Sequence, residues 1–447
     1  MPLRQLSLCG IGLLAASICG LTLGAATDES LPSRPGVDAP ELALLGPNAV
    51  GYRTIELSQP DQLDVLRYDA AQRTFPHVTR TLTVDLWYPA RAGHETRPML
   101  YEGALPSEPD MPDAHFTVSG LATRDAPPAP GADRGLVIVS HGYSNVTAAL
   151  TWLTENLASK GYVVAAIRHG DPPLTDRAKT SEPTMRRPLD IAFVARELQR
   201  RARAGEPLLA GAAADRIALI GYSMGGYGVL TAAGASLSAA SSAVSSVPGG
   251  ALSAYASGQP RAAELLVTGV KAVVAISPFG GAARLNVWGA AGLAQLRVPL
   301  LLIVGDHDQS VGYRDGVRNI FDQAIHAPRY LLVYENAGHS IGLNPAPMGM
   351  RQRLWDLDWF ADPVWRTSRV NAVNLHFITA LLDRYVNGEP DRAAYLDSSV
   401  VEGSAGTWPA ELTRYDAYSP GGAGRVWKGF QKRHVAGLQL YHAAPAP

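Results

Sequence analysis

One short segment constrains the fold of this chain more than any other: a serine set between glycines, where an apolar run meets a helix-prone run. The segment Gly221–Gly225 reads GYSMG, follows Ile217–Ile220 and leads into Tyr227–Ala235. A Gly-x-Ser-x-Gly at a strand-to-helix junction forms a tight, strained turn, and its glycines leave room for the neighbouring strand and helix. The serine then stands at the carboxyl edge of a sheet, where the helix N-terminus favours developing negative charge. The segment therefore predicts that Ser223 is a nucleophile carried by an α/β sheet.

A nucleophilic serine needs a histidine that takes its proton and a carboxylate that holds this histidine in the right tautomer. Two apolar runs downstream, Leu300–Val304 and Arg329–Tyr334, predict buried parallel strands. Polar loops follow these runs at residues 305–311 and 336–340. Because parallel strands end at the same edge of a sheet, we expect both loops to lie near Ser223.

The second loop supplies the predicted base and the first loop the predicted acid. We predict His339 as the base. Histidines before Ser223 would break the chain order, His307 lies between the two candidate acids, and His376 lies in an apolar helix-like stretch. The remaining histidines after Ser223 follow no strand that ends at this edge. We predict Asp308 as the acid, at a spacing from the strand that is typical of α/β-hydrolases. Asp306 lies closer to the strand end and is expected to cap the loop. Glu335, at the end of the last strand, is a more distant alternative.

Stabilising the negative oxygen of a tetrahedral intermediate requires two backbone N–H groups. The residue after the nucleophile, Met224, is expected to supply one. The other is expected from the loop after the strand Leu136–Ser140, where His141, Gly142 and Tyr143 follow. We predict that Tyr143 is this second donor, through its backbone; His141 and Gly142 are also typical of a tight turn.

Several stretches of the chain resemble bacterial dienelactone-hydrolase-like proteins, a group similar to the platelet-activating-factor acetylhydrolases of the α/β-hydrolase superfamily. The resemblance covers roughly residues 50–387. It is carried by the elbow and by Leu136–Gly142, Leu157–Ala166, Arg187–Ile191, Tyr330–His339 and Pro363–Trp365. It implies an α/β-hydrolase fold, with a mostly parallel central sheet flanked by helices and with loop insertions near the site. True dienelactone hydrolases have a cysteine where this chain has Ser223, so we expect ordinary carboxylic esters as substrates.

The N-terminal segment has the pattern of a secretory signal peptide. Arg4 precedes the apolar run Leu6–Leu23, and small residues follow up to Ala26. We expect cleavage after Ala26, which removes residues 1–26 and makes the protein secreted or periplasmic. A membrane anchor is the alternative, but the run is short, interrupted by glycines and without a basic stop-transfer flank.

Both cysteines of the chain, Cys9 and Cys19, fall inside this segment. A lipid on Cys19 is disfavoured because Ile18 is bulky where lipoproteins have a small residue. The mature protein is therefore expected to have no thiol and no disulfide, and to rely on its core, for which the chain is long enough.

The charge is balanced, with 39 Lys and Arg against 40 Asp and Glu. This balance gives no support to nucleic acid or an anionic membrane as a partner. No cofactor or metal site emerges: His169, Gly170 and Asp171 follow a strand without further residues at ligand spacing, which favours a turn. We expect no integral membrane span after removal of the signal peptide, and a small-molecule or lipid ester as the binding partner.

The remaining chain is expected to hold one catalytic domain, residues 48–387. A flexible segment, 27–47, precedes it and a loop-rich extension, 388–447, follows it. Strands and helical patterns alternate from Leu136 onward, which predicts a parallel sheet with helices on both faces. Insertions are expected at 89–134, a Pro- and Asp-rich surface excursion, at 236–259, a flap or a solvated loop, and at 344–367.

The last insertion contains Trp355, Trp359 and Trp365 shortly after His339. These aromatic side chains are predicted to wall a substrate pocket, or to pack the C-terminal helix onto the sheet.

The sequence thus predicts a serine hydrolase that cleaves carboxylic esters through an acyl-enzyme intermediate. A serine peptidase or amidase, or a lipid-ester hydrolase, would use the same triad, because fold and triad do not choose the leaving group. A ligand-binding protein without catalysis is the alternative from another class, although such proteins usually lose a member of the triad.

Overall fold

The computed structural model describes residues 31–91, 99–130, 134–173, 177–209, 211–407, 425–431 and 433–447. The predicted signal peptide, residues 1–26, and both cysteines lie outside the described residues. The strands are β1 (Ala49–Leu63), β2 (His77–Ala90), β3 (Met99–Leu105), β4 (Ala114–Gly120), β5 (Thr123–Arg124), β6 (Arg134–Ser140), β7 (Val163–Arg168), β8 (Ala212–Tyr222), β9 (Val270–Ile276), β10 (Leu300–Gly305), β11 (Arg329–Tyr334) and β12 (Leu438–Ala443). The α-helices are α1 (Thr151–Ser159), α2 (Ser181–Arg203), α3 (Met224–Ala232), α4 (Ser242–Ser245), α5 (Gly289–Leu293), α6 (Arg318–Gln323), α7 (Leu354–Asp358), α8 (Thr367–Tyr385) and α9 (Ala393–Leu396).

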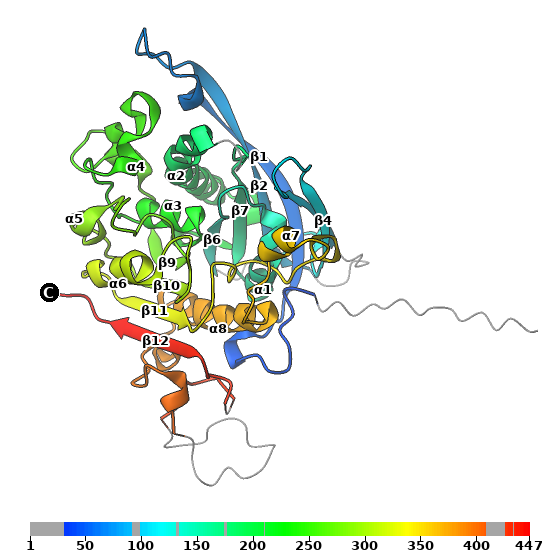
Figure 1. Cartoon of the computed structure of the whole chain (residues 1–447). Coiled ribbons are helices and arrows are strands. Elements are labelled where there is room, and N and C mark those ends of the chain that lie inside the picture. The colour runs from blue at the N-terminus through cyan, green and yellow to red at the C-terminus, as the bar shows by residue number, and fades with distance from the viewer. Residues whose placement is uncertain are drawn as a thin grey trace, which may run out of the picture.

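The described residues form one large twisted sheet in the order β12-β11-β10-β9-β8-β6-β7-β2-β1-β5, and a separate β3–β4 hairpin (Figure 1). Strands β7, β6, β8, β9, β10 and β11 pair in parallel. Strand β2 is antiparallel to both β7 and β1, β12 is antiparallel to β11, and the short β5 is parallel to β1. The chain moves from β6 to β7 on one side and then to β8 on the other. The connections that follow β6 and β8 therefore run in opposite directions along the sheet. In such sheets ligands bind at the carboxyl ends of the two strands between which the direction changes, here β6 and β8. The mostly parallel sheet flanked by helices confirms the predicted α/β-hydrolase fold.

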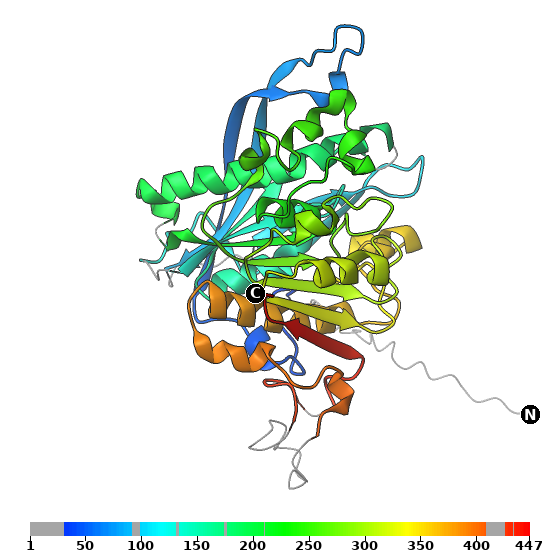
Figure 2. The same cartoon turned by 90° about the vertical axis from the view of Figure 1, so that its left-hand side faces the viewer.

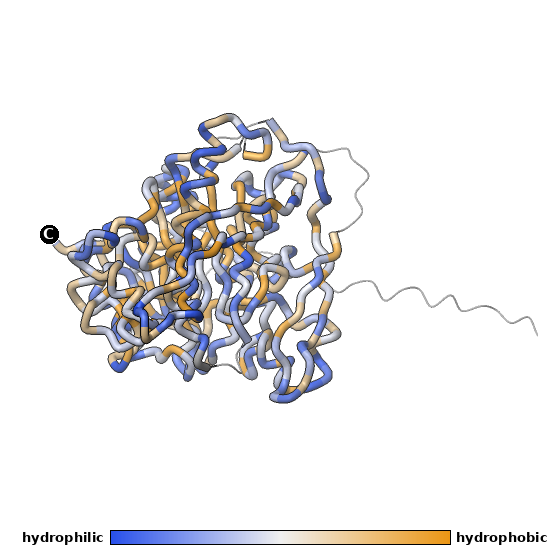
Figure 3. The backbone as a smooth tube through the Cα atoms, turned by 90° about the horizontal axis from the view of Figure 1, so that it is seen from above, coloured by the Kyte–Doolittle hydropathy of each residue, from blue (hydrophilic) through white to orange (hydrophobic). Residues whose placement is uncertain are grey.

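Alternating side chains of each central strand supply two cores, one on each face of the sheet. In β6, Val137 and Val139 pack with side chains of α1 and α8, whereas Leu136 and Ile138 pack with α2, α3 and α6. Figure 2 shows the long helix α2 on one side of the strands and α8 on the other. Figure 3 shows the hydrophobic residues gathered along the strands in the middle of the molecule. Because both faces are covered, the strand ends are the accessible edge.

Helix α2 begins at Ser181, earlier than the predicted helix at 189–204, and continues through Pro188. A proline inside a helix leaves the carbonyl four residues earlier without its hydrogen bond. Here that carbonyl belongs to Thr184, and the Tyr227 hydroxyl donates to it at 2.8 Å. Tertiary contact with α3 thus compensates for the proline, which the local sequence does not reveal.

The described part of the segment 27–47, which the sequence indicated as flexible, is held against α1. The Ser33 hydroxyl donates to Glu155 at 2.6 Å, and the Asn156 side chain donates to the Ala43 carbonyl at 2.9 Å. The sequence did not show this because the anchoring groups are single polar atoms on a distant helix.

The extension 388–447 adds β12 to the sheet, antiparallel to β11. Its Trp427 and Phe430 are buried against α8, with both rings 5.7 Å from the ring of Phe377. The described part of the extension therefore belongs to the body of the domain.

Two insertions are also more ordered than the sequence indicated. The stretch 89–134 contains the β3–β4 hairpin, and residues of β4 alternate between buried and exposed positions. The stretch 236–259 contains α4 and the 3₁₀ segment η6 (Pro248–Tyr255), where Val244 and Leu252 are fully buried. The latter stretch is thus packed on the domain and is neither a free flap nor a solvated loop.

Within the described residues, no helix combines the length and the apolar character needed to cross a membrane.

Candidate active site

Ser223 lies on the tight turn between β8 and α3. Its backbone is in a strained, left-handed region, with φ 54° and ψ −115°. The two glycines are needed for close approach: a Cβ on Gly221 would lie 2.2 Å from the Gly225 carbonyl oxygen, and a Cβ on Gly225 would lie 2.0 Å from the Ser140 carbonyl oxygen. The GYSMG segment therefore adopts the turn that its sequence predicts.

The structure brings together the three residues predicted as a triad. The Ser223 Oγ lies 3.1 Å from His339 Nε2, and His339 Nδ1 lies 2.8 Å from Asp308 Oδ2. The His339 side chain is 23% exposed and that of Asp308 is fully buried. This arrangement permits proton transfer from the serine to the histidine, with the carboxylate holding the Nδ1–H tautomer.

Asp308 is held as a carboxylate by its surroundings. Its other oxygen, Oδ1, accepts the backbone N–H groups of Ser310 at 2.9 Å and Val311 at 3.1 Å. Burial alone would raise the pKa of Asp308, but the hydrogen bond and charge of His339 and the N–H of Val311 lower it below the ordinary value. The charged form that His339 requires is therefore favoured.

The two alternative acids have other partners. Asp306 accepts the backbone N–H of Asn336 at 2.6 Å and lies 2.7 Å from His307 Nδ1. Glu335 accepts a hydrogen bond from Gln439 in β12 at 3.0 Å. Asp306 thus caps its loop, as its position predicted.

Two residues that the sequence analysis did not single out hold His339 in place. The Tyr222 hydroxyl donates to the His339 carbonyl at 3.1 Å, and the two rings lie 5.2 Å apart. Burial, together with the nearby Asp308, raises the pKa of Tyr222, which keeps the hydroxyl protonated. Asp362 accepts the N–H of Gly338 at 2.7 Å and fixes the loop from the other side. Tyr222 could have been noticed as the residue before the nucleophile, whereas no sequence signal marks Asp362.

The predicted oxyanion donors lie on either side of Ser223. Met224 is the first residue of α3, so its N–H has no carbonyl partner within the helix. The loop after β6 lies directly beside the elbow: a Cβ on Gly142 would be 3.4 Å from Ser223 Cβ. Tyr143, the next residue, lines the same cavities as Ser223. Both predicted donors are thus next to the nucleophile.

Two cavities meet at the nucleophile. One, of about 440 Å³, is lined by His339 and by the indoles of Trp355 and Trp359. The other, of about 750 Å³, extends toward α4 and is lined by apolar residues such as Phe279 and Leu285. Because Ser223 lines both cavities, an ester carbonyl held at Ser223 would have space for its acyl group in one cavity and for its alcohol group in the other.

The three predicted pocket tryptophans divide into two groups. Trp355 and Trp359 line the first cavity, and their indole N–H groups donate to the Pro106 carbonyl at 3.3 and 2.9 Å. Trp365 does not line it: its N–H donates to the Glu335 carbonyl at 2.8 Å, and its ring packs edge-on against Tyr334. The pocket prediction for Trp365 is therefore wrong, because the loop turns this ring toward the end of β11.

Among the described residues, no group of three or more His, Cys, Asp or Glu side chains is arranged to hold a metal ion. His169 and Asp171, which the sequence indicated as part of a turn, belong to a hydrogen-bonded network beside the oxyanion loop. His169 contacts Ser140, and Asp171 accepts the backbone N–H of Ser144.

Part of this chain is similar to a known family, and its structure can be aligned with solved structures. Residues 119–275, less than half of the chain, match the family described as PETase: PET hydrolase-like; this stretch contains the elbow and the oxyanion loop. None of the curated proteins matches the chain. Among solved structures, the ferulic acid esterase from Streptomyces cinnamoneus aligns at 20% identity and a TM-score of 0.47, over 78% of this chain and 94% of that one. The sheet topology and the elbow show an α/β-hydrolase fold, and the family match covers the segment that carries the elbow.

Proposed function

We propose that this ester hydrolase acts as a serine esterase in which Ser223, His339 and Asp308 form the catalytic triad. The observation that carries the proposal is the pair of contacts at His339, 3.1 Å from its Nε2 to the serine oxygen and 2.8 Å from its Nδ1 to the carboxylate. Ser223 Oγ attacks the ester carbonyl carbon as its proton passes to His339. The N–H groups of Tyr143 and Met224 stabilise the oxygen that becomes negative.

The intermediate collapses when the bond to the alcohol oxygen breaks and His339 donates its proton to the leaving group. The acyl group then remains on Ser223. A water molecule gives a proton to His339 and attacks this acyl group, and the serine recovers its proton as the acid leaves. The products are one alcohol and one carboxylic acid, and no cofactor takes part.

The substrate that the site fits is an ester with a bulky apolar or aromatic group. The cavities on both sides of Ser223 have volumes of about 440 and 750 Å³. Trp355 and Trp359 offer flat aromatic surface in the smaller one, and ring stacking favours an aromatic moiety there. The matching family is described as PET hydrolase-like, which agrees with esters of this kind.

The first test is the loss of the nucleophile. Ser223→Ala is expected to lower kcat on p-nitrophenyl esters on the order of a million-fold, because the triad acts as a unit. A fluorophosphonate probe should label the wild type and leave the variant unlabelled. A Ser223→Ala protein with near-normal turnover would refute the triad, and p-nitrophenyl esters of increasing chain length would size the pocket.

The same experiment separates the alternatives. Hydrolysis of a p-nitroanilide as fast as that of the matching p-nitrophenyl ester would favour a peptidase or amidase. A folded wild type that neither reacts with the probe nor hydrolyses any ester would favour a ligand-binding protein.

Export from the cytoplasm is a further part of the proposal, supported by the apolar run Leu6–Leu23. The expected result is a mature protein whose N-terminal residue is Thr27, found by N-terminal sequencing of the protein outside the cytoplasm.

A further inference from the structure

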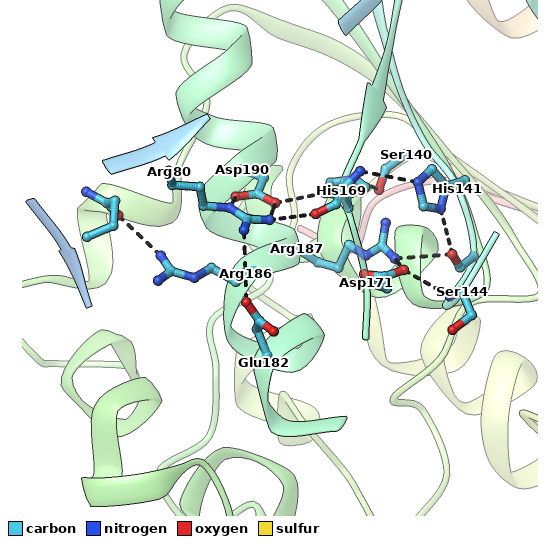
Figure 4. Close-up of polar contacts among 12 residues, drawn as sticks. Arg80, Ser140, His141, Ser144, His169, Asp171, Glu182, Arg186, Arg187 and Asp190 are labelled. Atoms are coloured by element: carbon cyan, nitrogen blue, oxygen red, sulfur yellow. Dashed lines mark hydrogen bonds and ion pairs between the residues drawn. The ribbon is translucent and has the colours of Figure 1, made fainter. Parts of the chain in front are cut away.

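A largely buried polar cluster is hydrogen bonded to the oxyanion loop that follows β6. It comprises Arg80, Ser140, His141, Ser144, His169, Asp171, Glu182, Arg186, Arg187 and Asp190, most of them on α2 or at the ends of β6 and β7 (Figure 4). Charges cost free energy in a protein interior unless they are paired and hydrogen bonded. Here Arg80 pairs with Asp190 and Arg187 pairs with Asp171.

Hydrogen bonds from the cluster converge on one acceptor in the oxyanion loop, the carbonyl oxygen of Gly142. Arg187 Nη2 donates to this oxygen at 3.1 Å, and His141 Nδ1 contacts it at 2.7 Å. The backbone N–H of Asn145 also donates to it, at 3.3 Å. Three donors thus converge on a single carbonyl in the interior.

The contacts of the Arg187 guanidinium are made to the oxyanion loop and to Asp171, which binds the same loop. Its side chain is fully buried, and its Nε and Nη1 have no partner among the described residues. Nη2 donates to Gly142 and also pairs with Asp171. Asp171 in turn accepts the backbone N–H of Ser144 at 2.9 Å, at a left-handed residue with φ 51°. Both contacts of the guanidinium therefore hold the loop 142–144.

His141 is held as a neutral donor. Burial, with the nearby positive charge of Arg187, lowers the pKa of His141 to about 3. Its Nε2 accepts the backbone N–H of His169 at 3.4 Å, which leaves Nδ1 to carry the proton that reaches Gly142. His169 is fixed between Ser140 and Asp190, each 2.9 Å away.

The Gly142 carbonyl and the Tyr143 N–H belong to the same trans peptide, so they point in opposite directions. Fixing the carbonyl toward Arg187 and His141 therefore directs the Tyr143 N–H away from these two side chains. Tyr143 lines the same two cavities as Ser223, which is where an oxyanion donor is needed. A rotated peptide would place the carbonyl oxygen toward the nucleophile and remove the donor from the oxyanion site.

We propose that Arg187 is a positioning residue that fixes the Gly142–Tyr143 peptide in the orientation needed for oxyanion stabilisation. This role rests on the proposed esterase function. Arg187→Met is expected to lower kcat on p-nitrophenyl acetate by about 100-fold, as removal of one oxyanion donor does, with KM changed less than about twofold.

The discriminating readout compares p-nitrophenyl acetate with its thionoacetate. A C=S sulfur gains less from N–H donors than a C=O oxygen, so a working oxyanion site favours the oxygen ester. Arg187→Met is expected to lower kcat/KM for the acetate at least about tenfold more than for the thionoacetate. General damage to the fold would lower both together and leave their ratio unchanged.

A matched control is available on the same helix. Arg186 is also buried, but it donates to Gln62 and to the Leu63 carbonyl, away from the oxyanion loop. Arg186→Met is expected to cost stability and leave the acetate-to-thionoacetate ratio at the wild-type value. If Arg187→Met does not fold, Arg187→Met with Asp171→Asn removes both buried charges, which costs less than leaving one unpaired.

The outcomes separate the two proposals. A wild type that hydrolyses neither ester overturns the esterase function, and the role of Arg187 with it. An active wild type whose Arg187→Met variant keeps its kcat or its ester ratio overturns the positioning role alone.

Discussion

Two aspartates of one loop, two positions apart, have different partners, and this decides which of them is placed to orient the proposed catalytic histidine, His339. Asp308 lies 2.8 Å from His339 Nδ1 and is fully buried, whereas Asp306 binds Asn336 and an exposed His307. An asparagine at the acid position can hold the histidine in the wrong tautomer and leaves the imidazolium without a counter-charge.

Asp308→Asn is therefore expected to lower kcat by about 10⁴-fold, the loss known for the same change in a Ser-His-Asp triad. Asp306→Asn is the matched control and should keep kcat within about threefold, because it changes a loop cap only. Steady-state kinetics on p-nitrophenyl butyrate measure both. Equal losses in the two variants would contradict the assignment of the acid.

At this scale the sequence predicts residues that lie at fixed positions after strands. Ser223, Asp308 and His339 each follow a strand of one parallel sheet, so chain order and strand ends are enough to bring them together. Arg187 and Asp362 act from other elements, and their roles depend on side-chain directions set by tertiary packing. Sequence spacing carries no information on such directions.

At the scale of elements, α7 brings aromatic surface to the cavity beside Ser223. Trp355 is 44% exposed and lines the cavity with Trp359, although both indole N–H groups bind the Pro106 carbonyl. The helix and the loop after β3 thus hold the two rings in place before substrate binds.

Trp355→Ala is expected to raise KM for p-nitrophenyl benzoate about fivefold with kcat little changed, since an aromatic contact contributes about 1 kcal/mol. Leu354→Ala is the control: this side chain is 71% exposed on the same helix and does not line the cavity. Initial rates over a range of benzoate concentrations give both constants. If KM is unchanged in Trp355→Ala, the Trp355 indole does not contact the substrate.

Helices and strands could be predicted where the local pattern of apolar residues determines the secondary structure. The apolar runs of β6, β10 and β11 are found at their predicted places because both of their faces are buried. The start of α2 was not predictable, because Tyr227 compensates for Pro188 from another helix. The β3–β4 hairpin was missed although β4 alternates, since Pro and Asp dominate the stretch around it.

For the whole molecule, the two ends of the described chain are part of the folded body. Strand β12 covers the edge of β11, which would otherwise expose unpaired backbone groups. His376 on α8 accepts the backbone N–H of Leu42 at 3.2 Å and packs against Phe430 of the C-terminal extension. The N-terminal segment and the C-terminal extension therefore both contact the buried His376.

Three buried histidines contribute to the acid stability of this body. Burial lowers the pKa of His141, His169 and His376 to about 3 each; Arg187 adds to the effect at the first two and Lys160 at the third. In the unfolded chain each would have a pKa of about 6.5. Between these values the unfolded state binds protons that the folded state does not, so stability is fully present above pH 6.5 and falls with pH below it.

The free energy of unfolding should therefore fall by up to about 4 kcal/mol per pH unit below pH 6, about 1.4 kcal/mol for each histidine. Urea midpoints from tryptophan fluorescence at pH 7.5, 5.5 and 4.5, at constant ionic strength, measure this slope. His376→Leu removes one titrating group and should reduce the slope by about a third. A midpoint that stays constant from pH 7.5 to 4.5 would show that the folded and unfolded states take up protons equally over this range. The lowered pKa of the three histidines would then be contradicted, and with it the neutral His141 donor at the oxyanion loop.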